Sequence, residues 1–377
     1  MTHCIRFPGK YLQGPEVIEH LGSHISILGK KMLVISSKRT WTQLGAKIQN
    51  SSSTCNVKLV NLLFCGECTE QEIQRIFETF QEQQCDFVLA VGGGKVIDTS
   101  KAVAQKVNCP LAVLPTSASS DAPCSGVAVI YREDGTHSHG IITDHNPDIV
   151  MVDTKIIAQA PPRLLAAGMG DALATWPEAC ACAKSKGNVI SGGHSDPAAI
   201  LLAQQCHDTI LRLGQSAFEA AKQHCVTDEF DSVIRAVVLF SGVGFESGGL
   251  AAAHAIGDSF SIMRPGWQFL HGERVAFGTM VQLLLEGDID GLRKVTEFAK
   301  RTGLPYRLEQ FGIAATDKEV IRQVAKKAAE AESMKNMPFV ISSQDIENAM
   351  WAVNNQKTLK NIYARTSVPT FYLFSKL

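Results

Sequence analysis

The stretch FVLAVGGGKVIDTSKAVA, residues 87–104, decides the fold. Its first five residues form a short apolar run, which is typical of a strand buried on both faces of a parallel sheet. Three glycines follow directly, and the residues after them have the pattern of a helix. Glycine lets backbone amides approach a ligand closely, and a helix N-terminus favours negative charge. The stretch therefore predicts a strand, a glycine turn and a helix that can hold a phosphate, although the same arrangement also serves as a plain connection.

Strand and helix patterns alternate on both sides of this stretch. Further strands are expected at residues 31–36, 57–64, 111–114 and 148–153, with a hairpin from residue 127. Helices between them are expected at residues 40–50 and 70–84. From about residue 163 the patterns are almost only helical, the last of them at residues 343–360. We therefore predict an N-terminal α/β domain with a parallel sheet, residues 1–160, and an all-α C-terminal domain, residues 161–377, with the ligand site in the cleft between them.

The composition is that of an ordinary globular protein. Of 377 residues, 45% are hydrophobic and 19% are charged, with a net charge of −1, so we expect neither nucleic acid nor an anionic membrane surface as a partner. No apolar run approaches the roughly 20 residues of a membrane span, and the N-terminus lacks an apolar signal core. The 11 cysteines have no framework spacing. These features predict a cytoplasmic protein with reduced thiols.

Two histidines are candidate metal ligands. His254 lies in GFESGGLAAAHAIGDSF (residues 244–260), and His271 lies in FLHGERVAFG (residues 269–278). A catalytic zinc site takes three protein ligands and keeps one position open. The best third candidate is Asp171, in GMGDALATWPEA. The alternative is that each histidine is a hydrogen-bonded core residue, since no close-spaced pair such as HExxH supports a metal.

A second loop, LPTSASSDAPCSG (residues 114–126), is rich in short hydroxyl side chains. Thr116, Ser119 and Ser125 can donate to a ribose, an amide or a phosphate. Asp121 can accept from a substrate hydroxyl. The alternative is a capped polar loop that binds nothing.

Five motifs occur in order along nearly the whole chain: VGGGKVIDTSKAVA, LPTSASSDAPCSGVAVIY, VDTKIIAQAPPRLLAAGMGDALATW, GFESGGLAAAHAI and HGERVAFGTMVQLLLEG. Together they resemble the glycerol dehydrogenases of the iron-containing alcohol dehydrogenase family. The resemblance implies oxidation of glycerol or a related small diol with NAD, at Zn²⁺, by a homo-oligomer that in many members is an octamer. It implies that Asp171, His254 and His271 hold the zinc and carry the catalytic and substrate contacts.

The resemblance also implies roles for residues in both loops. The pyrophosphate contacts would be Gly94, Lys95, Val96, Ile97 and Asp98. The nicotinamide and ribose contacts would be Thr116, Ser119, Ser125, Val127 and Tyr131. Asp121 would contact a substrate hydroxyl, and Phe245 would line the substrate pocket.

Three positions depart from the family pattern. Ser37, followed by two basic residues, stands where an acidic residue usually accepts from the adenosine ribose, so we expect NADP to be tolerated beside NAD. Gly257 and Asp258 replace a His-Asn pair. Pro177 replaces an aromatic residue, and it predicts that a helix over residues 171–185 kinks or restarts at Trp176.

Two other functions stay open. A lyase of the dehydroquinate-synthase kind shares this architecture and uses NAD and a metal, but it needs several basic side chains around a phosphate-bearing substrate. The motifs here are mostly small and apolar, with Arg274 as the main exception. The second alternative is a non-catalytic paralogue that binds only the nucleotide.

Overall fold

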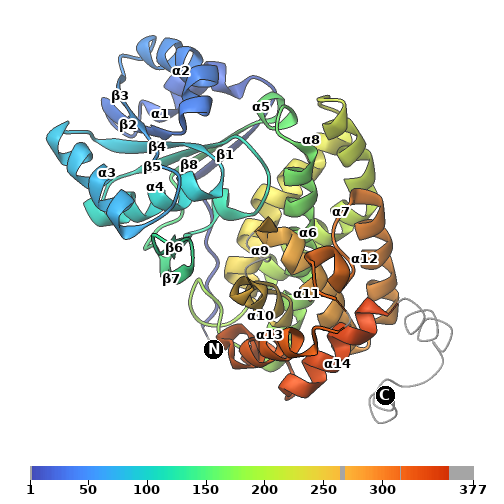
Figure 1. Cartoon of the computed structure of the whole chain (residues 1–377). Coiled ribbons are helices and arrows are strands. Elements are labelled where there is room, and N and C mark those ends of the chain that lie inside the picture. The colour runs from blue at the N-terminus through green and yellow to red at the C-terminus, as the bar shows by residue number, and fades with distance from the viewer. Residues whose placement is uncertain (1, 264–267, 315, 356–377) are drawn as a thin grey trace.

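The computed structural model describes residues 2–263, 268–314 and 316–355. An α/β part built by the N-terminal residues lies beside a helical part built by the rest of the chain (Figure 1). In the described part of the chain no single helix has the length and apolar composition to span a membrane. Residues Asp228–Gly248 and Ala252–Ile262 reach that composition only as a pair, bent by 105°.

A six-stranded parallel sheet forms the α/β part. Its strands are β1 (Lys10–Gly14), β2 (Lys31–Ser36), β3 (Lys58–Leu63), β4 (Phe87–Gly92), β5 (Leu111–Pro115) and β8 (Ile149–Asp153). Their order across the sheet is β1-β8-β5-β4-β2-β3, and each hydrogen-bonded pair is parallel. The short apolar runs therefore predicted five of these strands correctly, whereas β1, with the sequence KYLQG, is not such a run.

Helices cover both faces of the sheet. They are α1 (Leu21–Ile25), α2 (Lys38–Ser53), α3 (Glu70–Glu82), α4 (Gly94–Val107) and the short α5 (Thr154–Ala158). Side chains of β2 alternate between two cores, with Met32 and Val34 against α1 and α2, and Leu33 and Ile35 against α3 and α4. Figure 1 shows these helix pairs on opposite sides of the strands. A strand buried on both faces must be apolar throughout, which is why its pattern is a run rather than an alternation.

A separate two-stranded hairpin follows β5. Its strands β6 (Val127–Tyr131) and β7 (His137–Ile142) pair antiparallel, as predicted. The backbone amide of Tyr131 donates to the carbonyl of Cys68, which ties the hairpin to the segment before α3.

The elements described after β8 are all helical. The long ones are α6 (Pro162–Ser185), α7 (Pro197–Lys222), α8 (Asp228–Arg235), α9 (Ser241–Gly248), α10 (Ala252–Ser259), α11 (His271–Glu286), α12 (Ile289–Thr302), α13 (Lys318–Glu330) and α14 (Ser343–Asn354). They confirm the predicted change from α/β to helical structure. Residues 356–360 of the last predicted helix lie outside the described residues.

Pro177 lies inside a single helix. α6 runs without interruption from Pro162 to Ser185, so the helix does not restart at Trp176 and that half of the prediction is wrong; a kink there stays a prediction. Proline lacks the amide that would bond to Leu173 and costs roughly 3 kcal/mol in a helix interior. Burial offsets this cost, because most of α6, Pro177 included, is packed inside the helical part.

The segment before β1, residues 2–9, joins the two parts. The amide of Arg6 donates to Ser247 Oγ at 3.1 Å, and its guanidinium lies 3.3 Å from the fully buried carboxylate of Glu246. Arg6 Nη2 also donates to the carbonyl of Thr143, directly after β7. One side chain thus connects the end of the hairpin to α9. The domain boundary between residues 160 and 161 stays a prediction, and this segment touches both sides of it.

Candidate active site

The three candidate metal ligands come together from three helices. Asp171 is on α6, His254 is on α10, and His271 is the first residue of α11. Oδ1 of Asp171 lies 3.4 Å from Nε2 of His254 and 3.2 Å from Nε2 of His271. One ligand atom from each residue lies within 4.8 Å of the other two. The same three residues were predicted from the sequence.

The residues present fit a divalent cation. Tetrahedral zinc, with bonds of about 2.0–2.1 Å, holds its ligand atoms about 3.3 Å apart, which matches both distances from Asp171. Asp171 is 1% exposed, and neither carboxylate oxygen has a hydrogen-bond partner among the described residues. Burying a charge without partners is costly, and a bound cation would remove that cost. His271 is 38% exposed at its side chain, so this group is reachable from solvent on one side.

The electrostatics of the group also favour a cation. Burial alone would raise the pKa of Asp171, but the charges of the adjacent His271 and His254 hold that pKa below its usual range. Burial lowers the pKa of His271, but the negative charges of Asp171 and Asp258 raise it to about 10. The carboxylate therefore gathers positive charge around it. A metal would take the place of those protons, because only neutral imidazole binds a metal ion.

Very close helix crossings bring the ligands together. A Cβ at Gly272 would lie 1.8 Å from the carbonyl oxygen of Ala167 and 3.0 Å from Cβ of Asp171, where α11 crosses α6. A Cβ at Gly278 would lie 2.1 Å from the carbonyl oxygen of Ala253, where α11 crosses α10. Only glycine allows backbones to approach this closely. The small residues of the ligand motifs are therefore needed to assemble the site.

Glu178, which was not predicted from the sequence, contacts His254 on the ring nitrogen that faces away from Asp171. Its Oε2 lies 2.5 Å from Nδ1 of His254, and its Oε1 accepts from the backbone amides of Ala251 and His254. The side chain is fully buried. It follows Asp171 by seven residues on α6 and so lies on the same helix face. A carboxylate on the far nitrogen of a ligating histidine sets its tautomer and orientation.

Asp258 occupies the corresponding place at the second histidine. Its Oδ1 lies 3.3 Å from Nδ1 of His271, but its side chain is 61% exposed. The two histidines thus have unequal support, a buried carboxylate behind His254 and an exposed one behind His271. This is one of the positions at which the chain departs from the family pattern.

Replacing Asp258 with asparagine is expected to weaken zinc binding by about tenfold. The change keeps the size of the side chain but removes the charge that increases the basicity of His271, and loss of such a partner costs roughly 10–100-fold in metal affinity. Competition with a chelator of known affinity measures the effect. Asp208→Asn is the matched control, because Asp208 pairs with His207 at 3.6 Å outside the ligand group. An affinity within about twofold of the unmodified protein would contradict the expectation.

The predicted cofactor loops meet at the carboxyl ends of the strands. Gly92 ends β4, Ser37 directly follows β2, and the amide of Thr116 after β5 donates to the carbonyl of Gly92 at 3.0 Å. These three strands are neighbours in the sheet. Ligands of open α/β sheets bind outside the carboxyl ends of the strands. The glycine turn and the hydroxyl loop therefore share one edge.

The glycine turn is open to a ligand. Gly93 precedes α4, and no side chain caps this helix N-terminus. A Cβ at Gly93 would lie 3.5 Å from Ser117 Oγ, and one at Gly94 would lie 4.0 Å from Ser120 Oγ. Ser117 and Ser120 thus stand beside the turn, although the sequence analysis named their neighbour Ser119. The amides of α4 and these hydroxyls form a cradle suited to a phosphate.

The other residues of the predicted pyrophosphate loop differ in which atoms are available to bind a phosphate. Val96 and Ile97 are 5% and 1% exposed and belong to the core, so only their backbone amides are available to a ligand. Lys95 is 57% exposed and pairs with Glu67 at 2.5 Å. Its ammonium group is therefore already partnered.

A buried lysine, Lys101, holds the hydroxyl loop in place. Its Nζ donates to the carbonyls of Ala122 and Val127 at 2.6 Å and to Ser125 Oγ at 3.3 Å, and it lies 3.7 Å from Asp98. The hydroxyl of Ser125 and the carbonyl of Val127 are thus bound within the protein. Their predicted contacts with the cofactor would need other atoms or a shared hydrogen bond.

Asp121 lies close enough to the ligand group to interact with its charges. Burial is the main cause that raises the pKa of Asp121 to about 7, and the charge of Asp171 adds to it. The charges of His254 and His271 lower that pKa. Ser241 Oγ donates to Asp121 Oδ2 at 3.0 Å. Phe245 is 8% exposed on α9. Tyr131, at the end of β6, is partly buried, and burial raises its pKa to about 12.

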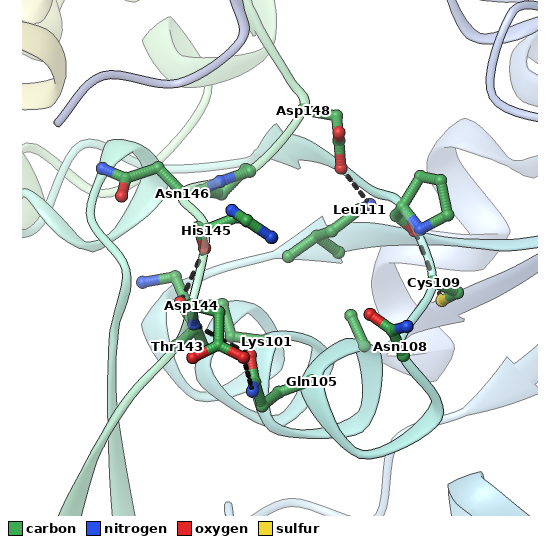
Figure 2. Close-up of a pocket in the computed structure, with 13 residues that line it drawn as sticks. Lys101, Gln105, Asn108, Cys109, Leu111, Thr143, Asp144, His145, Asn146 and Asp148 are labelled. Atoms are coloured by element: carbon green, nitrogen blue, oxygen red, sulfur yellow. Dashed lines mark hydrogen bonds between the residues drawn. The ribbon is translucent and has the colours of Figure 1, made fainter.

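A cavity of about 240 Å³ lies elsewhere in the fold. Figure 2 shows it between the end of α4 and the segments before β5 and β8, with Gln105 bonded to Asp144 across one side. Leu111 and Asp148, at the amino ends of two strands, line it. It therefore opens at the edge of the sheet opposite the glycine turn and is not the predicted site.

Known proteins similar to this chain share its fold over nearly their whole length. Residues 8–154 match the family model of iron-containing alcohol dehydrogenases. The chain is 42% identical over 340 residues to glycerol dehydrogenase of Escherichia coli O6:H1 strain CFT073, covering 90% of this chain and 93% of the relative. It is 36% identical over 352 residues to glycolaldehyde reductase of Halobacterium salinarum, covering 93% and 96%. The structure of glycerol dehydrogenase from Schizosaccharomyces pombe matches with a TM-score of 0.91 at 31% identity, covering 98% of this chain and 94% of that one.

The chain therefore belongs to the iron-containing alcohol dehydrogenase family of oxidoreductases. Within that family it is similar to glycerol dehydrogenases, as the motifs indicated. The predicted architecture, a parallel α/β part followed by a helical part, is confirmed.

Proposed function

We propose that this protein oxidises glycerol to dihydroxyacetone with NAD at a bound zinc ion, and that it also accepts other vicinal diols. The observation that carries the proposal is the ligand group Asp171, His254 and His271 at the distances of a tetrahedral site. The glycine turn and hydroxyl loop at the carboxyl edge of the sheet support NAD as the cofactor. The names of the relatives support glycerol as the substrate.

The residues of the chain divide the work of this reaction. Asp171, His254 and His271 would hold the zinc, which when bound supplies a Lewis acid that lowers the pKa of a substrate hydroxyl. Asp121 accepts a hydrogen bond from the neighbouring hydroxyl and so selects substrates that carry two. Phe245 limits the size of the pocket. The amides at the start of α4 would hold the pyrophosphate of NAD, and Thr116, Ser119 and Tyr131 would orient its ribose and nicotinamide.

A substrate panel tests the proposal. NADH formation is measured with glycerol, 1,2-propanediol and ethanol, before chelation, after chelation and after zinc is returned. We expect NADH from both diols, loss of the rate after chelation and its recovery with zinc. Glycolaldehyde with NADH is included because of the reductase relative. No net NADH from any diol would contradict the proposal.

The same panel separates the two alternatives. A lyase of the dehydroquinate-synthase kind regenerates its cofactor, so it would give no net NADH. A non-catalytic paralogue would bind NAD without turnover. An assembled ligand group favours an enzyme over a binding protein, because nucleotide binding alone does not need it.

We also propose a cytoplasmic homo-oligomer, an octamer by resemblance, in which residues 1–160 bind NAD and residues 161–377 carry the metal. Sedimentation of the purified protein measures its mass. A monomer at working concentration would contradict the oligomer.

Replacing Ser37 with aspartate is expected to lower the specificity constant for NADP by about tenfold and to leave that for NAD within about threefold. Ser37 Oγ accepts from the amide of Thr40 and so caps α2. Aspartate keeps the cap and adds a charge that repels a 2′-phosphate. The exposed Lys38 and Arg39 attract that phosphate in the unmodified protein.

Ser37→Asn is the control for this change, because it caps the helix without adding charge. The ratio of specificity constants for NAD and NADP is measured in all three proteins. An unmodified enzyme that already rejects NADP by about a thousandfold would contradict relaxed cofactor choice, since another group would then guard the ribose.

A further inference from the structure

The helix that carries Ser241 changes its winding just before that residue. Residues Ala236–Phe240 form a π-helical turn, η3, between α8 and α9, and the helix continues through it. The amide of Ser241 donates to the carbonyl of Ala236, five residues earlier. One extra residue in a turn rotates all later side chains by about 100° relative to a regular α-helix. The direction of Ser241 is therefore set by this turn.

A side chain from a neighbouring helix supports the turn. Cys206 on α7 is fully buried, and its Sγ lies 3.2 Å from the carbonyl oxygen of Ala236. The carbonyl that accepts the π-type bond thus has a second donor. Single π-turns inside α-helices are rare and occur often at functional sites.

Ser241 lies in the middle of a buried chain of hydroxyls that ends on Asp121. Its Oγ is 3.0 Å from Asp121 Oδ2 and 2.9 Å from Thr175 Oγ1. Ser241 is fully buried and Thr175 is 1% exposed. Ser241 donates its single proton to Asp121, so its oxygen accepts from Thr175. The hydroxyl of Ser241 is thereby locked toward the carboxylate.

The backbone after Ser241 touches the backbone at Asp121. A Cβ at Gly242 would lie 3.1 Å from the carbonyl oxygen of Asp121 and 3.0 Å from Cβ of Cys124. Both the carboxylate and the main chain of Asp121 therefore contact the first turn of α9. Thr175 adds a link to the metal ligands, because it follows Asp171 by four residues on α6 and lies on the same face.

We propose that Ser241, turned toward the site by η3, is a positioning residue that holds the carboxylate of Asp121 in the direction of a substrate hydroxyl and so sets the affinity for diols. This inference rests on the proposed function, in which Asp121 contacts the substrate. Ser241 need not touch the substrate itself.

The first test replaces Ser241 with alanine. Loss of a hydrogen bond to a charged group is expected to raise KM for glycerol about tenfold, with kcat within about threefold. NAD affinity and zinc content stay unchanged. Thr175→Val removes the second hydroxyl at constant size, and we expect a rise in KM of about threefold, because Ser241 can then turn away. Ser52→Ala is the control, since this buried hydroxyl bonds only to Ile48 within α2, and it leaves KM unchanged.

A double-mutant cycle separates positioning from a structural role. In protein that carries Asp121→Ala, adding Ser241→Ala is expected to change KM by less than about twofold, because the group that Ser241 positions is gone. Losses that multiply in the double variant would overturn the proposal. A rise in KM for Asp121→Ala without one for Ser241→Ala would overturn it too and leave the proposed function intact. An unchanged KM in Asp121→Ala would instead contradict the proposed role of Asp121.

Discussion

Replacing His254 with alanine is expected to give a protein that holds no zinc and whose rate of NAD reduction with glycerol falls by at least about a thousandfold. His254 supplies one of the three ligand atoms. It is 7% exposed, so bulk water does not readily replace it as a ligand. Zinc per chain is measured by mass spectrometry of metals, and the rate by NADH absorbance at saturating glycerol.

A second variant separates loss of the metal from loss of the fold. His254→Ala also leaves the buried Glu178 without the imidazole at 2.5 Å, which destabilises the protein by itself. In His271→Ala the carboxylate on the far nitrogen is the exposed Asp258, so water can replace that contact, and the buried Asp171 keeps His254 beside it. Both variants are expected to lose zinc, whereas His207→Ala on α7 keeps zinc and activity. Normal zinc content and normal turnover in either ligand variant would show the assignment wrong.

The second large effect is expected from Gly272→Ala. The new methyl group would lie 1.8 Å from the carbonyl oxygen of Ala167, and backbone cannot turn aside as a flexible side chain can. Helices α6 and α11 must separate, which costs about 3 kcal/mol of stability and displaces His271 from Asp171. Thermal unfolding and zinc content measure both consequences.

Gly140→Ala in strand β7 is the control for this substitution. Its added methyl group would have only the carbonyl oxygen of Ala128 near it, at 3.9 Å, so a change below about 0.5 kcal/mol is expected. Wild-type stability together with full zinc content in Gly272→Ala would contradict the close crossing.

Patterns within a single element were enough to predict most of the fold. The buried strands are apolar on both faces, so β4 and β2 stand out as runs in the sequence. The candidate metal ligands could be named as candidates because their residue types are chemically distinctive and their neighbours are small, and the family resemblance then implied their role. Pro177 shows the opposite case. A local rule predicted an interrupted helix, but the burial of α6 outweighs one missing hydrogen bond.

Residues whose role depends on contacts between elements could not be predicted. Glu178 carries no motif, and only the packing of α6 against α10 brings it to His254. The π-turn before Ser241 has no marker in AVVLF, since its support comes from Cys206 on another helix. Ser117 and Ser120 differ from Ser119 only in which way the loop turns them.

The ion pair between Arg6 and Glu246 bears on the order in which the chain folds. The amide of Arg6 and its partner Ser247 are separated by 241 residues, so this contact cannot form until α9 has left the ribosome. Until then the buried carboxylate that pairs with the guanidinium is absent, and the residues before β1 lack their contacts with α9. Contacts between such distant residues slow folding, because a long loop must close first. We therefore expect residues 2–9 to stay exposed to proteases during synthesis until α9 has emerged, whereas β1 can pair with β8 as soon as residue 153 is free.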